Sequence, residues 1–349
     1  MSRSAPSRTD PKRSPRILLI RLRRIGDVVM TTPAVSALRD HFPRAEIAYL
    51  IEEPFRELIE GHPCVDEPIV IPRRMPRRDF LKFIQRLRRK HYDIAVDFHG
   101  GPKAFLIALL SGARLRIGYR VPYKHVLYHK SLPRRPQKGV YHSVENHLNL
   151  VRLLGVEPAV VPGLSLPEGT SAEKSRVEHW LAESMPDGAP RIVLHIGAGN
   201  DFRDWGEDNL DALITRLLDI PETRVILAGA EADAPRARRL LRDASGRLSS
   251  AAGLFNLREL RELLSRASLF VGADSGPMHI AAAAGPPIVA LFGPTRPAHF
   301  APWQAEAVII QKELDCRPCR QRECRHGDFR CLQTITPDEV FEACRGMLE

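Results

Sequence analysis

An aspartate follows the first apolar run of the chain. Residues 16–22 (RILLIRL) are typical of a buried parallel strand. Residues 23–27 (RRIGD) form a turn, and we expect one helix to follow over residues 28–41. An aspartate at a helix start is often an N-cap, and that interpretation remains open. The alternative is a carboxylate at the carboxyl edge of a sheet, where it acts as a general base. Asp27 is therefore the candidate catalytic residue.

A glycine-rich loop follows a second apolar run, residues 191–195. Residues 195–200 (HIGAGN) can present backbone N–H groups to a phosphate, and Arg203 comes three residues later. An arginine at this place can neutralise a diphosphate, although a plain surface loop is the alternative. The dinucleotide fingerprint G-x-G-x-x-G is absent, which removes the main support for nicotinamide chemistry.

A third motif, residues 272–279 (GADSGPMH), leaves an expected strand and opens an expected helix. Ser275, Gly276 and the helix N-terminus form a candidate anion site, and His279 lies one turn into the helix. Asp274 would repel a phosphate, but it can accept hydrogen bonds from sugar hydroxyls or from backbone. The alternative is a capped helix with a core histidine.

Four cysteines lie close together near the end of the chain, at Cys316, Cys319, Cys324 and Cys331. Four thiolates can surround one zinc ion tetrahedrally, so we predict a structural zinc site here. The spacing is not that of a paired C-x2-C knuckle. Reduced thiols or a conditional disulfide are the alternatives.

Strands are expected at residues 16–22, 45–50, 69–71, 93–97, 191–195, 224–228, 269–272 and 288–292. They alternate with helices along the chain, which predicts an α/β protein with parallel, doubly wound sheets. A proline-rich segment separates two such halves. We expect a disordered basic tail at residues 1–15, a first domain at 16–170, and a second at 171–349 that includes the cysteine cluster at 316–331. Ligands of such sheets bind beyond the carboxyl ends of the strands, so the cleft between two facing sheets is the expected site.

Composition excludes several classes of protein. The 349 residues carry 52 Lys and Arg against 42 Asp and Glu, a formal charge of +10, and 44% are hydrophobic, which excludes collagen and wholesale disorder. No stretch is long and apolar enough for a membrane span. No apolar run precedes Ile17, so we expect a cytoplasmic protein.

The positive charge gathers in the first half. Residues 73–90 hold nine Lys and Arg against one Asp, and residues 114–138 hold eight and no acid. A solvated face is one interpretation. The other is an anionic partner, namely a phosphorylated glycolipid, a membrane surface or a nucleic acid. Apolar residues at helical spacing within 79–90 predict a basic amphipathic helix.

Three segments together resemble a known family. IRLRRIGDVVMTTPAVSALRDHFP, DFHGGPKAFLIALLSGARLRIGY and GADSGPMHIAAAAGPPIVALFGPTRP are similar to the ADP-heptose:lipopolysaccharide heptosyltransferases, which are family 9 glycosyltransferases. The resemblance implies the GT-B fold, which is two facing Rossmann-like doubly wound domains with a cleft between them. It also implies an inverting transfer of heptose from ADP-heptose to the inner core of lipopolysaccharide.

The resemblance implies a role for each matching position. Asp27 matches the general base. Asp274 matches a contact to the donor sugar, while Ser275, Gly276 and His279 match the cradle of the donor diphosphate.

Two further donor-binding positions follow from the same resemblance. Arg203 stands where many members have a phosphate-binding lysine, and Glu231 stands where an acid lies near the nucleotide ribose.

The resemblance implies catalysis without a metal, so any zinc at the cysteines would be structural. The first domain would bind an anionic lipopolysaccharide core at the inner leaflet of the cytoplasmic membrane, as a peripheral protein, and the second would bind ADP-heptose. Three alternatives remain. The chain could be a glycosyltransferase with another donor sugar or acceptor glycan, a donor-binding protein without turnover, or a basic nucleic-acid-binding protein, although no known nucleic-acid module is present.

Overall fold

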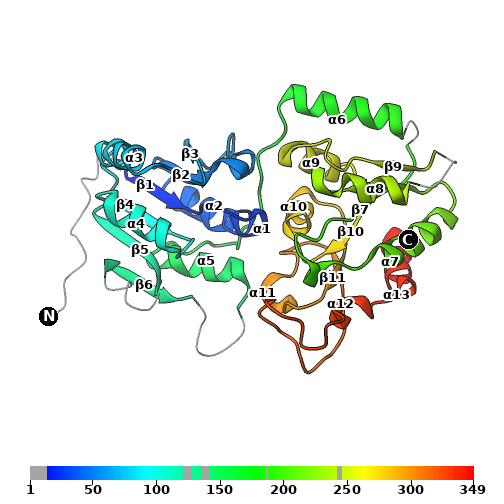
Figure 1. Cartoon of the computed structure of the whole chain (residues 1–349). Helices are drawn as coiled ribbons and strands as arrows, with labels where there is room; N and C mark the ends of the chain where they lie inside the picture. The colour runs from blue at the N-terminus through cyan, green and yellow to red at the C-terminus, as the bar shows by residue number, and fades with distance from the viewer. Residues whose placement is uncertain (1–13, 121–126, 135–140, 186–187, 242–245) are drawn as a thin grey trace. The chain divides into compact units, whose positions relative to one another are not determined.

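The computed structural model describes residues 14–120, 127–134, 141–185, 188–241 and 246–349 (Figure 1). The chain divides into two compact units, Met1–Gly163 and Leu164–Glu349. This division precedes the predicted boundary between residues 170 and 171. The segment before residue 170 contacts the second unit, where the Gly169 N–H donates a hydrogen bond of 2.8 Å to the buried Glu262 carboxylate.

The first unit contains a sheet of six parallel strands in the order β3-β2-β1-β4-β5-β6. Its central strand β1 is an apolar run with four fully buried residues, as expected where helices cover both faces of a parallel sheet. The strands are β1 (Arg16–Ile20), β2 (Glu46–Glu52), β3 (Glu67–Ile71), β4 (Ile94–Asp97), β5 (Leu115–Arg120) and β6 (Lys130–Pro133).

Helical segments connect these strands and bury apolar side chains in the core of the unit. In α3, for example, Phe83, Ile84 and Leu87 lie at helical spacing and join the buried core. The helical segments are α1 (Ile25–Val29), α2 (Thr32–His41), the 3-10 turn η1 (Glu53–Leu58), α3 (Arg77–Arg89), α4 (Pro102–Leu110) and α5 (Ser143–Arg152).

The sequence predicts one helix over residues 28–41, and that prediction is wrong, because α1 and α2 are separate. Pro33 lies in the first turn of α2 and has no N–H to continue the helical ladder. The Thr31 and Thr32 hydroxyls instead donate hydrogen bonds to the Val28 and Val29 carbonyls, at 2.7 and 2.8 Å. The break leaves α1 as one short turn that carries Asp27.

The second unit repeats the topology, with six parallel strands in the order β12-β11-β10-β7-β8-β9. When the strands of each unit are numbered from its first strand, both sheets have the order 3-2-1-4-5-6. The expected pair of doubly wound sheets is therefore confirmed. The strands are β7 (Arg191–His195), β8 (Arg224–Ala228), β9 (Leu248–Ser250), β10 (Leu269–Ala273), β11 (Ile288–Phe292) and β12 (Ala307–Gln311).

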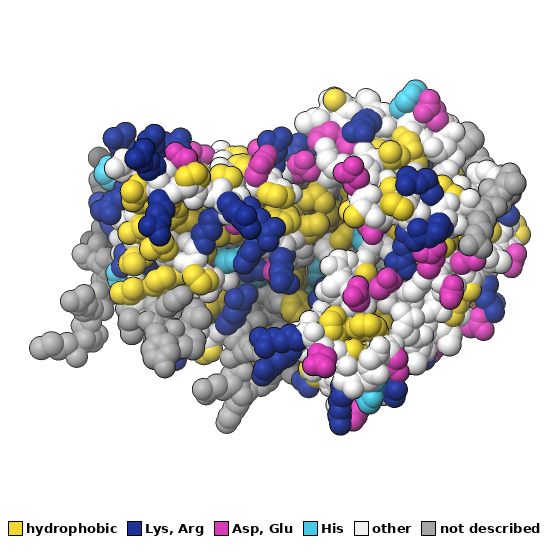
Figure 2. Space-filling view, viewed as in Figure 1, with side chains coloured by type: hydrophobic (Ala, Val, Ile, Leu, Met, Phe, Trp, Pro, Cys, Tyr) yellow, Lys and Arg dark blue, Asp and Glu magenta, His cyan; other side chains and the backbone are white. Residues whose placement is uncertain are grey.

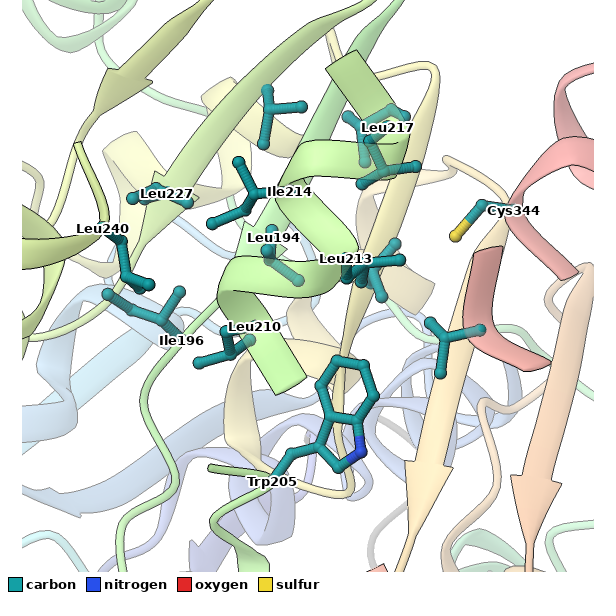
Figure 3. Close-up of a cluster of buried hydrophobic side chains, with 14 of the residues drawn as sticks. Leu194, Ile196, Trp205, Leu210, Leu213, Ile214, Leu217, Leu227, Leu240 and Cys344 are labelled. Carbon is teal, nitrogen blue, oxygen red and sulfur yellow. The ribbon is translucent and has the colours of Figure 1, made fainter. Parts of the chain in front are cut away.

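The core of the second unit forms where α7 and α13 pack beside the sheet (Figure 3). Trp205 is buried there, and its indole N–H donates to the Ile335 carbonyl at 2.8 Å, so the loop before α7 is fixed to the C-terminal segment. The helical segments are α6 (Ser171–Ser184), η3 (Asp201–Arg203), α7 (Glu207–Asp219), η4 (Glu231–Asp233), α8 (Ala234–Leu240), α9 (Leu257–Leu264), α10 (Gly276–Ala284), α11 (Pro297–Phe300), α12 (Arg330–Gln333) and α13 (Pro337–Leu348).

No helix in the described part of the chain combines the length and the apolar character that a membrane crossing requires.

Candidate active site

Both sheets place conspicuous polar residues at the point where the strand order reverses. In the first unit this point lies between β1 and β4, and in the second it lies between β7 and β10. The loops that leave two such strands run in opposite directions, which opens a crevice at the carboxyl edge where ligands bind. The three predicted motifs at Asp27, Arg203 and Asp274 follow β1, β7 and β10.

Asp27 is not the N-cap of its helix. Arg24 occupies that position with a φ of 73°, and no side chain caps the helix. Asp27 lies in the first turn, with 30% of its side chain exposed. The N-cap interpretation is therefore wrong, and the carboxylate is accessible at the carboxyl edge of the sheet.

A buried arginine fixes the orientation of this carboxylate. Arg21 follows β1 and is only 2% exposed. Its guanidinium forms an ion pair with Asp27 Oδ2 and donates a hydrogen bond of 2.7 Å to the Phe98 carbonyl. A buried guanidinium needs such partners because an uncompensated charge inside a protein costs several kcal/mol. Arg21 thus connects the loop after β1 to the loop after β4.

The loop after β4 is organised by Asp97, which is fully buried. One of its oxygens accepts the N–H groups of His99 and Gly100 at 2.8 and 2.9 Å, and the other accepts the Tyr128 hydroxyl at 2.6 Å. Burial raises the pKa of Asp97, while these hydrogen bonds oppose the shift. The turn positions His99 beside the Arg21–Asp27 pair.

His99 is a neutral imidazole near a carboxylate and several cations. Burial lowers its pKa to about 4, and the charges of Arg21, Arg23 and Arg134 add to this effect, while Asp27 opposes it. Among the described residues, His99 Nδ1 is buried without a hydrogen-bond partner. His99 was not predicted as a site residue, although the run DFHGG after a strand was a signal for it.

In the second unit, Arg203 and Asp274 meet. Arg203 Nη1 donates to the Asp274 carbonyl at 2.7 Å, and its Nη2 lies 3.7 Å from Asp274 Oδ2. The Thr295 hydroxyl donates to the same carboxylate. Burial raises the pKa of Asp274, and the Arg203 charge and the Thr295 hydrogen bond oppose the shift. Two motifs separated by 71 residues in sequence therefore form one polar cluster.

The start of α10 offers donors beside this pair. Ser275 precedes the helix in an extended conformation, and its hydroxyl does not cap it. Within the described part of the chain, Ser275 Oγ is buried without a hydrogen-bond partner. Gly276 begins the helix, whose first N–H groups are unsatisfied by helical bonds, and His279 is buried one turn later. This combination of free donors suits an anion.

His195 and Glu231 lie nearby on the same sheet edge. His195 ends β7, and burial lowers its pKa to about 4, so its imidazole is neutral at pH 7. Glu231 follows β8 and is exposed in η4, where Gly253 packs against its backbone. Among the described residues, no hydrogen bond or ion pair connects Glu231 with Arg203 or Asp274.

The cysteine segment reaches this cluster. It follows β12, and its Gln321 Oε1 accepts a hydrogen bond of 3.3 Å from Arg203 Nε. Arg317 donates a hydrogen bond of 2.9 Å to the Thr295 carbonyl. The segment therefore supports both Arg203 and the partner of Asp274. The sequence contained no signal for these two contacts.

The four cysteines of this segment are free thiols that line one pocket with Phe202 and Pro294. Backbone N–H groups, first those of His326 and Phe329, lower the pKa of Cys324. Burial raises the pKa of Cys331. The ligand atoms of Asp315, Cys316 and His326 lie within 4.8 Å of one another. The predicted four-cysteine set and this trio share Cys316, and among the described residues no three of the four cysteines form such a group.

Comparisons with known proteins agree with this architecture. Glycosyltransferase family 9 (heptosyltransferase) matches residues 80–329. Lipopolysaccharide heptosyltransferase 1 of Pseudomonas aeruginosa is 28% identical over 327 residues, which cover 89% of this chain and 88% of that protein. Lipopolysaccharide heptosyltransferase 3 of Escherichia coli is 25% identical over 331 residues, covering 93% and 96%.

Solved structures agree as well. The family 9 glycosyltransferase of Veillonella parvula superimposes with a TM-score of 0.83 at 23% identity, covering 96% of this chain and 97% of that one. The ADP-heptose lipopolysaccharide heptosyltransferase II of Escherichia coli gives a TM-score of 0.79 at 25% identity, covering 95% and 98%.

The two Rossmann-like units are those of a GT-B glycosyltransferase, so the protein is an enzyme of that class. The chain belongs to glycosyltransferase family 9, the heptosyltransferases.

Proposed function

We propose that this enzyme transfers heptose from ADP-heptose to the inner core of lipopolysaccharide. Relatives over nearly the whole chain are named lipopolysaccharide heptosyltransferases. Solved structures with the same fold contain ADP and ADP-2-deoxy-2-fluoro heptose. The observation that carries the proposal is the cluster of Arg203, Asp274 and Ser275 at the switch point of the second unit, because it suits a sugar diphosphate.

The proposed reaction is a single inverting displacement with Asp27 as general base. The acceptor hydroxyl oxygen attacks the anomeric carbon and forms the new glycosidic bond. The bond between that carbon and the diphosphate oxygen breaks, and ADP leaves with its electron pair. Asp27 takes the proton of the acceptor hydroxyl. Arg21 supports this role because it holds the carboxylate in one orientation.

The leaving diphosphate gains negative charge in the transition state, and the chain supplies fixed positive groups for it. In this proposal Arg203, the N-terminus of α10 and the Ser275 hydroxyl stabilise that charge without a divalent metal. Asp274 accepts hydrogen bonds from the donor sugar. His279 contacts the diphosphate, and Glu231 contacts the ribose.

The two units have separate tasks in this proposal. The first unit binds the anionic acceptor, since Arg23 and Arg134 place positive charge near His99 and the Arg21–Asp27 pair. The second unit binds the donor. An acceptor linked to lipid would place the enzyme at the inner leaflet of the cytoplasmic membrane as a peripheral protein.

Calorimetric titration with sugar nucleotides in EDTA tests the donor assignment. We expect ADP-heptose to bind more tightly than ADP, and both to bind at least about tenfold more tightly than UDP or GDP, a difference of about 1.4 kcal/mol. EDTA should not change these affinities, because the proposed site uses protein cations. A preference for UDP or GDP would contradict the heptose assignment and favour another donor sugar. Absence of binding to all four would contradict a donor site that is formed before the acceptor binds.

We further propose a structural zinc ion at Cys316, Cys319, Cys324 and Cys331. The four thiols share one pocket, and the backbone N–H groups around Cys324 favour its thiolate, which is the form that binds metal. Soft thiolate ligands suit zinc. The ion would hold the segment that carries Arg317 and Gln321 against the donor cluster.

Metal analysis of the purified chain tests the zinc site. We expect about one zinc ion per chain, and loss of it in the variant Cys319→Ser/Cys331→Ser. Affinity for ADP should fall by roughly tenfold in that variant, because Gln321 and Arg317 lose their positions. The control Cys64→Ser changes a cysteine of the first unit and should keep both properties. A wild-type chain that contains no zinc would contradict the proposal.

A further inference from the structure

Helix α3 has an outer face that is almost entirely cationic. Its apolar stripe is buried against the sheet, and six cations are exposed on the remaining surface. Among the described residues, none of the six forms an ion pair, and Asp79 is the only acid in the helix. The six cations are Arg77, Arg78, Lys82, Arg86, Arg88 and Arg89.

The neighbouring helix α4 differs from α3 because its outer side is apolar. Leu106 is 41% exposed, and Phe105, Leu109 and Leu110 are only half-buried. The one charged residue of α4, Lys103, is paired with the buried Glu52 carboxylate at 3.0 Å. The exposed surface of α4 around Leu106 is therefore apolar, because the only charge of the helix is used in an ion pair.

These two helices form one surface. They pack against each other, and Arg88 Cγ lies 3.8 Å from the place where a Cβ on Gly112, just after α4, would stand. On the other side, the Phe105 ring packs edge-on against Tyr128 at 5.5 Å, next to the exposed Leu127. We call α3, α4 and Leu127 the α3–α4 face.

The α3–α4 face holds a large share of the exposed apolar side chains. Of the seven large hydrophobic side chains that are exposed among the described residues, Leu81, Leu106 and Leu127 lie on it. Figure 2 shows Lys and Arg side chains gathered over α3, with apolar side chains exposed over the adjacent α4.

Folding stability does not account for this composition. Arg78 and Lys82 are one helical turn apart, as are Lys82 and Arg86, and like charges at this spacing destabilise a helix. Leucine side chains left in water contribute nothing to the core. A partner that neutralises the cations and also covers the leucines would offset both costs.

Two kinds of partner carry the required negative charge. A nucleic acid or another soluble polyanion would neutralise the cations, but it would leave the leucines in water. An anionic bilayer does both, because phosphate headgroups contact the cations while apolar side chains enter the boundary with the acyl chains. The exposed Leu81 and Leu106 therefore favour lipid.

We infer that the α3–α4 face is the membrane-docking surface of this enzyme and that it binds the headgroup region of an anionic phospholipid bilayer. The inference rests on the proposed function in one respect, since a lipid-linked acceptor makes a membrane the relevant surface. Docking through α3 and α4 would hold the first unit, with Asp27 and His99, close to the bilayer that contains the acceptor.

Sedimentation of the full chain with phospholipid vesicles, without sugar nucleotide, tests the inference. Wild-type protein should sediment with phosphatidylglycerol/phosphatidylethanolamine vesicles and not with phosphatidylcholine vesicles. We expect Lys82→Glu/Arg89→Glu to lower the partition coefficient on anionic vesicles by at least about tenfold. Leu106→Asp should lower it by about threefold or more, through loss of apolar contact.

Matched controls lie on the second unit. Arg238→Glu/Arg345→Glu makes the same change of net charge on exposed helical sites, and Leu241→Asp changes a leucine that is 39% exposed, close to the 41% of Leu106. Both controls should sediment like wild type. Equal sedimentation of the Lys82/Arg89 variant and wild type would overturn the inference. Loss of sedimentation in the Lys82/Arg89 variant, together with wild-type sedimentation of Leu106→Asp, would also overturn the inference. The surface would then bind anions through charge alone.

Activity assays separate this inference from the proposed function. With a lipid-free, water-soluble acceptor, the Lys82/Arg89 variant should retain wild-type turnover. With acceptor embedded in anionic vesicles, its turnover should fall in parallel with its binding. Vesicle binding that follows the predictions in a protein unable to transfer heptose would contradict the proposed function and support the docking surface.

Discussion

Replacing Asp27 by asparagine is expected to lower kcat by about a thousandfold, because the acceptor hydroxyl then has no carboxylate to take its proton. The amide keeps the shape of the side chain but cannot act as a base at neutral pH. Affinity for ADP-heptose should change by less than about threefold, since Asp27 lies in the first unit and the proposed donor site in the second. Transfer rates at saturating donor and acceptor, together with calorimetric donor binding, measure both quantities.

The Arg21 contact makes a stability control necessary for this variant. The Asp27→Asn change would leave a buried guanidinium with a neutral partner, and a buried charge that loses its counterion destabilises a protein by a few kcal/mol. Urea unfolding of Asp27→Asn therefore has to show that the variant is folded at the assay temperature. Asp40→Asn removes an exposed carboxylate from α2 and should behave like wild type in both measurements.

Turnover of Asp27→Asn near the wild-type rate would remove the general-base assignment. The neutral imidazole of His99 would then be the next candidate, because its low pKa leaves it deprotonated at pH 7 and its Nδ1 is buried without a hydrogen-bond partner among the described residues. His99→Gln distinguishes the two residues. If Asp27 is the base, this variant should retain far more turnover than Asp27→Asn.

Replacing Arg203 by alanine is the change with the second largest expected effect. We expect kcat/KM for the donor to fall by about a hundredfold to a thousandfold, the range seen when one fixed group that stabilises transition-state charge is removed. Both binding and turnover should fall, because the diphosphate is negative before the reaction and gains charge as its bond to the anomeric carbon breaks. Initial rates at varied donor concentration separate KM from kcat.

The geometry of Arg203 makes a second variant informative. Its guanidinium donates to the Asp274 carbonyl through one nitrogen and lies 3.7 Å from the Asp274 carboxylate through another. Arg203→Lys keeps the charge but loses the planar guanidinium group. We therefore expect its kcat/KM to be about tenfold higher than that of Arg203→Ala and still below that of wild type. Arg238→Ala is the matched control on α8 and should have wild-type kinetics. Wild-type kinetics in Arg203→Ala itself would remove this residue from the donor site.

The sequence predicted the central strands well because they are buried on both faces. β1, β4, β7, β10 and β11 are short continuous apolar runs, which a parallel sheet requires and few other structures produce. Since motifs that follow such strands must lie at the carboxyl edge of the sheet, the placement of Asp27, Arg203 and Asp274 followed from the sequence.

Two edge strands, β6 and β9, were not predicted, for the same physical reason. β6 (KSLP) and β9 (LSS) are short and lie at the ends of their sheets, so partial exposure leaves them without an apolar pattern. The break between α1 and α2 was also missed, because it depends on how the Thr31 and Thr32 hydroxyls replace the helical bonds that Pro33 interrupts.

Residue patterns along the chain were enough to predict the fold class, the alternation of strands and helices, and the positions of the site motifs. They did not show which side chains meet in the folded units, namely Arg21 with Asp27 and Phe98, and Arg203 with Asp274 and Gln321. Parallel strands become neighbours through crossovers of many residues, so the partners of each site residue depend on strand order. Strand order is set by packing of the whole unit, and local residue patterns do not encode it.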